Sequence, residues 1–281
     1  MKAFVFGSGK VGSCVARGLR GAGWSVDLRS ARRGLPHRLE VDVVIVATRD
    51  DQIAAAARDL AKVVGTEAVV LHVAGSLGPE ALGALRGKCK GVGQIHPMLS
   101  FADRRRAPTL AGAFAHVSGD RPAVAMARKV ARALGMKPRT MAGMDLGAYH
   151  AAGGLVASGT IALVQAGIEV LEAWGVEPGQ AVRMLGPLLR SVAENLEALG
   201  LPGALTGVVR RGDVVRAQAH LRAIREAAPA HVALYRGVLR AQLPLASALG
   251  EADRGDLERL GRLAASARSG GRAGRSSIRG R

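Results

Sequence analysis

The sequence predicts an α/β protein, in which a doubly wound, mostly parallel sheet is followed by an all-α C-terminal domain. In the first half, short apolar runs rich in Val, Ile and Phe alternate with Ala-, Leu- and Arg-rich runs of helical length. Such alternation indicates a parallel sheet with helices on its faces. After Asp145 only helical patterns follow.

The expected elements of the first half follow from these runs in chain order. We expect strands at Lys2–Phe6, Ser25–Leu28, Asp42–Ala47, Ala68–Val73, Val92–Ile95 and Ala113–Val117. We expect helices at Val11–Arg20, Gln52–Val63, Pro79–Leu85 and Ala123–Leu134.

The second half is expected to be helical because apolar residues recur there at helical spacing. Pro178 is suited to an early helical position, and Asp213 is suited to capping the next helix. A further helix is expected over His231–Leu249. We place the domains at residues 1–144 and 145–264, followed by a flexible basic tail at residues 265–281.

One segment, Leu146–Ile168, carries no formal charge and has the length of a membrane span. It is internal and contains five glycines together with polar residues. We therefore expect a buried helix shared between domains or subunits, not a membrane anchor. Its apolar surface favours a homodimer through the helical domain.

Composition excludes several classes of function. The net charge of +18 raises the question of nucleic-acid binding, but five of the arginines that produce this positive excess lie in the tail. The few aromatic residues (Phe 4, Tyr 2, Trp 2) offer little for base stacking, so we do not expect nucleic acid as the partner. The two cysteines form no CxxC motif, and the N-terminal apolar run is too short for a signal peptide, which favours a cytoplasmic protein.

A glycine motif directly follows the first expected strand and opens the first expected helix. It reads Gly7, Ser8, Gly9, Lys10, Val11, Gly12. The first glycine permits the tight turn, the second allows the backbone to approach a pyrophosphate, and the third allows the helix to pack on the strand. The motif predicts a dinucleotide site on a Rossmann sheet, with the phosphates at the helix N-terminus.

The end of the second strand indicates which dinucleotide binds. An NAD site usually has an acid about 20 residues past the glycines. Here Arg29 and Ser30 follow the strand, which favours the 2′-phosphate of NADP, although Asp27 would reach the strand end if the register were shifted by two residues. After the third strand, Thr48 is expected to contact the cofactor, and Asp50 or Asp51 to cap the following helix.

His96 precedes Pro97, which restricts it to extended geometry at the end of its strand. Ligands of open α/β sheets bind outside the carboxyl ends of the strands, so His96 is expected at the ligand edge, either as a catalytic residue or as a structural cap. A histidine that titrates near neutrality would exchange the proton that accompanies hydride transfer.

Ser76 is expected at the same edge as a substrate-side partner of His96, with Ala74 and Gly75 beside the cofactor. Tyr149 and His150 open the uncharged helix. They would form a second wall of an interdomain cleft or be satisfied by local backbone groups. The triplet Arg104–Arg106 is expected to be solvated surface, and no histidine shows metal-ligand spacing.

The chain resembles the bacterial Rossmann-like oxidoreductases whose helical half is known as domain of unknown function 2520. The motifs that carry the resemblance are GSGKVG, VIVATRDDQI, LHVAGSLG, GQIHPMLSF, YHAAGGLVASG and the TG…RGD turn. This family is similar to the 6-phosphogluconate dehydrogenase-like group, which includes pyrroline-carboxylate reductases, ketopantoate reductases and prephenate dehydrogenases.

The resemblance implies an NAD(P)-dependent enzyme that dimerises through its helical domain. By similarity to prephenate dehydrogenases, Ser76 and His96 would contact the substrate hydroxyl. The chain departs from those relatives at Ser100, where they have glycine, and at Val208, where they have proline. The first departure argues against prephenate itself.

We therefore expect an NADP-dependent oxidoreductase that transfers hydride between NADP(H) and a small carbonyl, imine or hydroxy compound. His96, Ser76, Tyr149 and His150 would be its catalytic residues. The alternative is a non-catalytic NADP-binding sensor or scaffold, because a fold does not fix a function.

Overall fold

The structure, a computed structural model, describes residues 1–266. Contacts divide the chain into two compact units, with the division after Ser158. The expected basic tail lies outside the described residues from position 267 onward. The expected domain boundary at residue 145 falls next to the start of helix α4 (Leu146–Glu172), through which the chain passes from one unit to the other.

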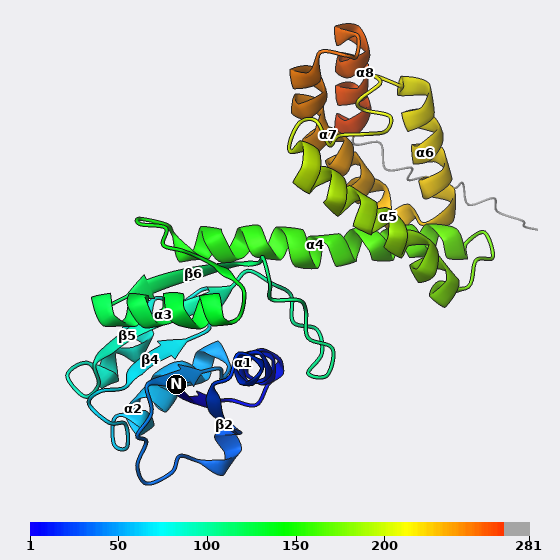
Figure 1. Cartoon of the computed structure of the whole chain (residues 1–281). Helices are drawn as coiled ribbons and strands as arrows, with labels where there is room; N and C mark the ends of the chain where they lie inside the picture. The colour runs from blue at the N-terminus through cyan, green and yellow to red at the C-terminus, as the bar shows by residue number, and fades with distance from the viewer. Residues whose placement is uncertain (267–281) are drawn as a thin grey trace, which may run out of the picture. The chain divides into compact units, whose positions relative to one another are not determined.

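The first unit contains a seven-stranded sheet of strand order β2-β1-β3-β4-β5-β6-β7 (Figure 1). All neighbouring strands are parallel except β5 and β6, which are antiparallel. The strands are β1 (Lys2–Phe6), β2 (Ser25–Arg29), β3 (Val43–Val46), β4 (Val69–His72), β5 (Gly91–Pro97), β6 (Phe114–Gly119) and β7 (Lys137–Arg139). The predicted doubly wound sheet is confirmed, and β7 is a short edge strand that the sequence pattern did not reveal.

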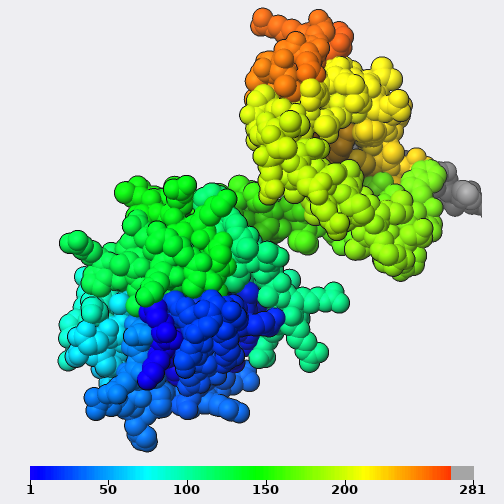
Figure 2. All heavy atoms as spheres, in the orientation of Figure 1, coloured from blue at the N-terminus to red at the C-terminus, as the bar shows by residue number. Residues whose placement is uncertain are grey.

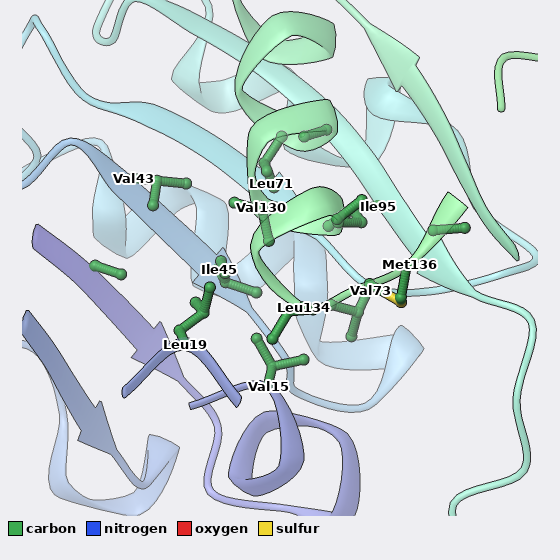
Figure 3. Close-up of a cluster of buried hydrophobic side chains, with 14 of the residues drawn as sticks. Val15, Leu19, Val43, Ile45, Leu71, Val73, Ile95, Val130, Leu134 and Met136 are labelled. Carbon is green, nitrogen blue, oxygen red and sulfur yellow. The ribbon is translucent and has the colours of Figure 1, made fainter. Parts of the chain in front are cut away.

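Helices cover both faces of this sheet. On one face, α1 (Lys10–Gly21) and α3 (Arg121–Ala133) pack their apolar residues against the strands, as Val15, Leu19, Val130 and Leu134 show in Figure 3. On the other face lie α2 (Ile53–Leu60) and η3 (Pro79–Leu85). The 3₁₀ turns η1 (Ala31–Arg33) and η2 (Asp50–Gln52) follow β2 and β3.

Two local expectations for the first unit were wrong. The segment Pro79–Leu85 is a kinked 3₁₀ helix and not an α-helix, with Leu82 outside helical geometry. Neither Asp50 nor Asp51 caps a helix with its side chain. Asp51 instead pairs with Arg49 at 3.0 Å, and Asp50 accepts a hydrogen bond from Ser76.

The second unit is entirely helical over its described residues. Its elements after α4 are α5 (Pro178–Leu199), α6 (Val214–Ala227), η4 (Pro229–His231), α7 (Val232–Leu249) and α8 (Arg254–Ala265). The predicted cap at Asp213 is present, because its side chain accepts from the Arg216 amide at 2.9 Å. Pro178 stands at the start of α5 as predicted, and Glu177 caps that helix by accepting from the Gln180 amide at 2.9 Å. Leu205, Val209, Leu221 and Leu239 form part of its core.

Helix α4 is largely exposed in the single chain, so its expected burial between subunits stays a prediction. Its length and composition would by themselves allow it to cross a membrane, yet only 6% of its most apolar window is buried within the chain. Leu155, Val156 and Ile161 are 79%, 73% and 69% exposed. Within the part of the chain that the structure describes, nothing covers this apolar surface.

Candidate functional site: a glycine turn and a histidine cluster

The turn after β1 has the geometry that the glycine motif requires. Gly7 has a φ of 120°, and a Cβ there would collide with the carbonyl of Ala47. A Cβ on Gly12 would collide with the carbonyl of Gly7, so both positions need glycine for close backbone packing. At Gly9 a Cβ would meet nothing within 4 Å. The turn is thus tight on its inner side and open over Gly9.

A cavity of about 800 Å³ opens at this turn. Gly7, Ser8 and Gly9 line one part of it, and the segments that follow β2 and β3, helix α2 and Arg104 line the rest. The hydroxyl oxygen of Thr48 is buried beside it and has no hydrogen-bond partner among the described residues. A buried hydroxyl without a partner is costly, which is consistent with a ligand group as its missing partner.

Of the two residues expected to favour the 2′-phosphate, only one lines this cavity. Ser30 lines it, but the expected Arg29 does not; Arg32 and Arg49 line it instead. Arg29 is the last residue of β2 and pairs in register with Phe6. The caveat about Asp27 is resolved by the same register, since Asp27 pairs with Phe4, two residues before the strand end.

Four more of the expected cofactor residues have distinct positions. Lys10 lines an adjoining cavity of about 660 Å³, together with Gly9. Val11 packs against the apolar core. Ala74 and Gly75 do not line the larger cavity; they follow β4 and lie beside His96.

The structure brings His96, Tyr149 and His150 together. His96 Nδ1 lies 3.0 Å from the Tyr149 hydroxyl, and the two rings meet edge to face with centroids 5.5 Å apart. A Cβ built on Gly75 would lie 2.7 Å from His96 Nε2 and 3.0 Å from His150 Nδ1. His96 Nε2 and His150 Nδ1 therefore both face the backbone of Gly75, and only glycine leaves them that space.

Burial sets the protonation of this cluster. Desolvation lowers the pKa of His96 from 6.5 to about 4, with smaller contributions from His150 and His116. The expectation that His96 titrates near neutrality is therefore wrong. Burial also raises the pKa of Tyr149, so its hydroxyl keeps its proton at neutral pH.

Ser76 hydrogen-bonds to Asp50 and not to His96. Its hydroxyl donates to Asp50 Oδ2 at 2.9 Å, and both residues are exposed at the edge of the sheet. The negative charge of Asp50 acts on His96 and on His72 in the direction of a higher pKa. Asp50 is thus a site residue that sequence reasoning assigned only to helix capping.

Two buried polar residues hold the loop that carries Gly75. Gln94 Nε2 donates to the Ala74 carbonyl at 2.6 Å, while Ser118 donates to Gln94 Oε1. His72 Nδ1 lies 3.3 Å from the Ala74 amide, and its Nε2 lies 2.9 Å from the Gly78 carbonyl. Because His72 and Gln94 are register partners in β4 and β5, both strands fix the same loop.

His116 is a further residue that the sequence did not reveal. It pairs with His96 across β5 and β6, and its ring lies 5.6 Å from that of Tyr149. The antiparallel pairing that places it there was not predicted from the sequence. Among residues 1–266, no group of three or more His, Cys, Asp or Glu side chains is arranged to hold a metal ion.

The sheet order, the glycine turn and the position of the cavity define a Rossmann-like fold with a dinucleotide-type site. Residues 113–241 match the family model described as Domain of unknown function (DUF2520). The resemblance to these Rossmann-like proteins is therefore confirmed over that part of the chain. No curated protein matches the sequence.

Several solved structures share the fold. A proposed NADP oxidoreductase from Bacteroides fragilis is 17% identical with a TM-score of 0.69, covering 86% of this chain and 97% of its own. A Thermotoga maritima protein is 22% identical with a TM-score of 0.68, covering 89% and 100%. Plasmodium falciparum pyrroline carboxylate reductase with NADP bound is 11% identical with a TM-score of 0.57, covering 89% and 98%. At these identities the likeness establishes the fold.

Proposed function

We propose that the protein is an NADP-dependent oxidoreductase acting on a small carbonyl, imine or hydroxy compound. The observation that carries the proposal is the His96–Tyr149 pair beside Gly75, at the same carboxyl edge of the sheet as the open glycine turn. The NADP-bound pyrroline carboxylate reductase and the proposed NADP oxidoreductase with this fold support it.

The residues of the first unit fit a dinucleotide. The open space over Gly9 suits a pyrophosphate at the N-terminus of α1, and Thr48 offers a buried hydroxyl without a partner. Ser30 and Arg32 would hold the 2′-phosphate, since an arginine fork and a hydroxyl are suited to phosphate oxygens. Bound there, NADP(H) would accept or supply hydride.

His96 would act on the substrate as a neutral imidazole. In the tautomer whose Nδ1 accepts from the Tyr149 hydroxyl, the proton of the ring is on Nε2, which faces Gly75. In that tautomer Nε2–H donates a hydrogen bond to a carbonyl oxygen or an imine nitrogen and stabilises the charge that develops on it. Tyr149 fixes the tautomer and ring orientation, and His150 forms a second polar wall.

Helix α4 supports a second part of the proposal, a homodimer. Apolar residues of α4 and of α5 are exposed in the single chain, with Leu188 and Leu199 of α5 60% and 62% exposed in addition to the residues of α4. A second copy that covers these residues removes them from water. We infer a cytoplasmic enzyme, in keeping with the two free thiols Cys14 and Cys89.

The test of the cofactor is paired titration of NADPH and NADH, followed by nicotinamide fluorescence. We expect NADPH to bind more tightly than NADH. We expect Arg32→Ala to reduce the ratio of the two affinities by roughly ten- to a hundredfold. Arg33→Ala is the matched control, because Arg33 is the exposed neighbour that does not line the cavity. NADH binding as tight as NADPH binding would contradict the assignment.

The test of catalysis is NADPH oxidation with a panel of small ketones, imines and 2-oxo acids. His96→Gln is expected to lower turnover by ~10²–10⁴-fold while leaving NADPH affinity nearly unchanged. Tight NADPH binding without turnover of any substrate class would instead favour a sensor or scaffold.

A further inference from the structure

The loop between β5 and β6 (residues 98–113) lies beside α1, as Figures 1 and 2 show. Arg17 of α1 donates from its guanidinium to the carbonyls of Arg104 and Arg105, at 2.7 and 3.2 Å. Asp103 Oδ1 accepts from the amides of Arg105 and Arg106, at 2.6 and 2.9 Å. The backbone of this arginine-rich turn is therefore held against the helix that begins at the glycine turn.

The side chain of Arg104 is not simply solvated surface, as the sequence suggested. Arg104 and Gly9 both line the large cavity at the glycine turn and the adjoining cavity over α1. Among residues 1–266, no other residue lines both of these cavities. Arg104 thus lines the space around Gly9 in both cavities, whereas Ser30 and Arg32 line only the larger one.

The charge of Arg104 has no partner within the described part of the chain. Its guanidinium forms no hydrogen bond or ion pair with residues 1–266, whereas the nearby Asp103 carboxylate is taken up by backbone amides. Lys10, Arg17 and Arg105 line the adjoining cavity. Asp103 is the one acidic residue among the described residues of that lining, so positive charges outnumber negative ones around Arg104, which favours an anion.

We propose that Arg104 binds the pyrophosphate of the dinucleotide, so that the β5–β6 loop forms the second wall of the cofactor site. This inference rests on the proposed function. The pyrophosphate is the group that approaches the middle glycine of the turn, Gly9. Arg104 lines both of the cavities that Gly9 lines. A guanidinium fork matches two phosphate oxygens at once.

The test compares two alanine variants of the same loop with both dinucleotides. Arg104→Ala is expected to weaken NADPH and NADH equally, by roughly ten- to a hundredfold, because both carry the pyrophosphate. Arg106→Ala removes the same charge from the same exposed turn but lines neither cavity, so it should leave both affinities unchanged. Arg104→Lys, which keeps the charge without the fork, should fall between wild type and Arg104→Ala.

A second measurement reports on the loop itself. Trypsin cleaves after arginine, and the exposed triplet Arg104–Arg106 is a ready substrate. NADPH should protect this loop in the wild type and in Arg106→Ala. The Arg104→Ala variant retains two cleavage positions in the loop. NADPH should not protect the loop of this variant, even at concentrations that saturate it. The fragments are identified by mass spectrometry, and circular dichroism checks that each variant is folded.

Each other outcome overturns a specific statement. If the Arg104→Ala and Arg106→Ala variants bind the dinucleotides with equal affinity, the role of Arg104 is overturned. The proposed function would still stand if the wild type binds NADPH. A loss confined to NADPH would place Arg104 on the 2′-phosphate and overturn the pyrophosphate assignment. A wild type that binds neither dinucleotide would overturn the proposed function and this inference with it.

Discussion

Replacing His96 by glutamine should make the first unit less sensitive to acid. The pKa of His96 falls from 6.5 to about 4 in the folded protein, chiefly because burial disfavours its charged form. Between these values the unfolded chain binds a proton that the folded chain does not, so stability is lost as the pH falls from 6.5 towards 4. At 1.36 kcal/mol per pKa unit, this linkage removes ~2 kcal/mol between pH 7 and about pH 5.

The assay is urea unfolding at the two pH values, followed by tryptophan fluorescence. The chain has two tryptophans, of which Trp24 packs against the core of the first unit. A Trp174→Phe background restricts the signal to Trp24. His96→Gln should lose ~2 kcal/mol less than its parent on going to about pH 5, whatever it loses at pH 7. His37→Gln, at an exposed histidine, is the control and should follow the parent.

The comparison uses only the change in the free energy of unfolding between the two pH values. Stability that the glutamine variant loses equally at both pH values, because contacts of the ring are lost, therefore cancels. His72 and His116, whose pKa values are also lowered by burial, remain in both proteins. An equal loss of stability in parent and His96→Gln would refute the reasoning. It would mean that His96 titrates alike in the folded and unfolded chains and is not desolvated.

Three other changes test the site and the assembly. Gly75→Ala should lower turnover by at least tenfold, because its Cβ would lie 2.7 Å from His96 Nε2 and displace the ring; kcat measured at saturating NADPH checks this. Gln94→Leu should destabilise the first unit by about 1–3 kcal/mol, because the Ala74 carbonyl and Ser118 lose their partner, and urea unfolding measures the loss. Leu155→Glu, on the exposed apolar surface of α4, should convert a dimer to monomers by light scattering, and a wild type of monomeric mass would contradict the dimer.

The glycine turn could be predicted from the sequence because its requirements are local. Gly7 and Gly12 are required by close backbone contacts within a few residues of each other and of β3, and such requirements leave a motif. His96 was also placed correctly at its strand end, because Pro97 restricts the residue before it. The strands themselves followed from apolar runs whose length and composition suit a buried parallel sheet.

Other site residues left no such signal. Arg104 lies far from Gly9 in the sequence, and nothing in a run of three arginines distinguishes a solvated turn from one held by Arg17 against α1. Likewise Arg32, not Arg29, lines the cavity, because the turn η1 that follows β2 decides which side chain faces inward. These assignments depend on contacts between separate elements.

The sequence by itself determined the fold class, the dinucleotide-type turn and the location of His96, because periodicity, glycine spacing and proline are properties of short segments. Only the tertiary structure decided the protonation of His96, its pairing with Tyr149 and the partner of Ser76. The physical reason is that a pKa depends on how much water the surrounding elements exclude, and a hydrogen bond on where distant elements meet. Neither quantity exists until β4, β5 and α4 are packed together.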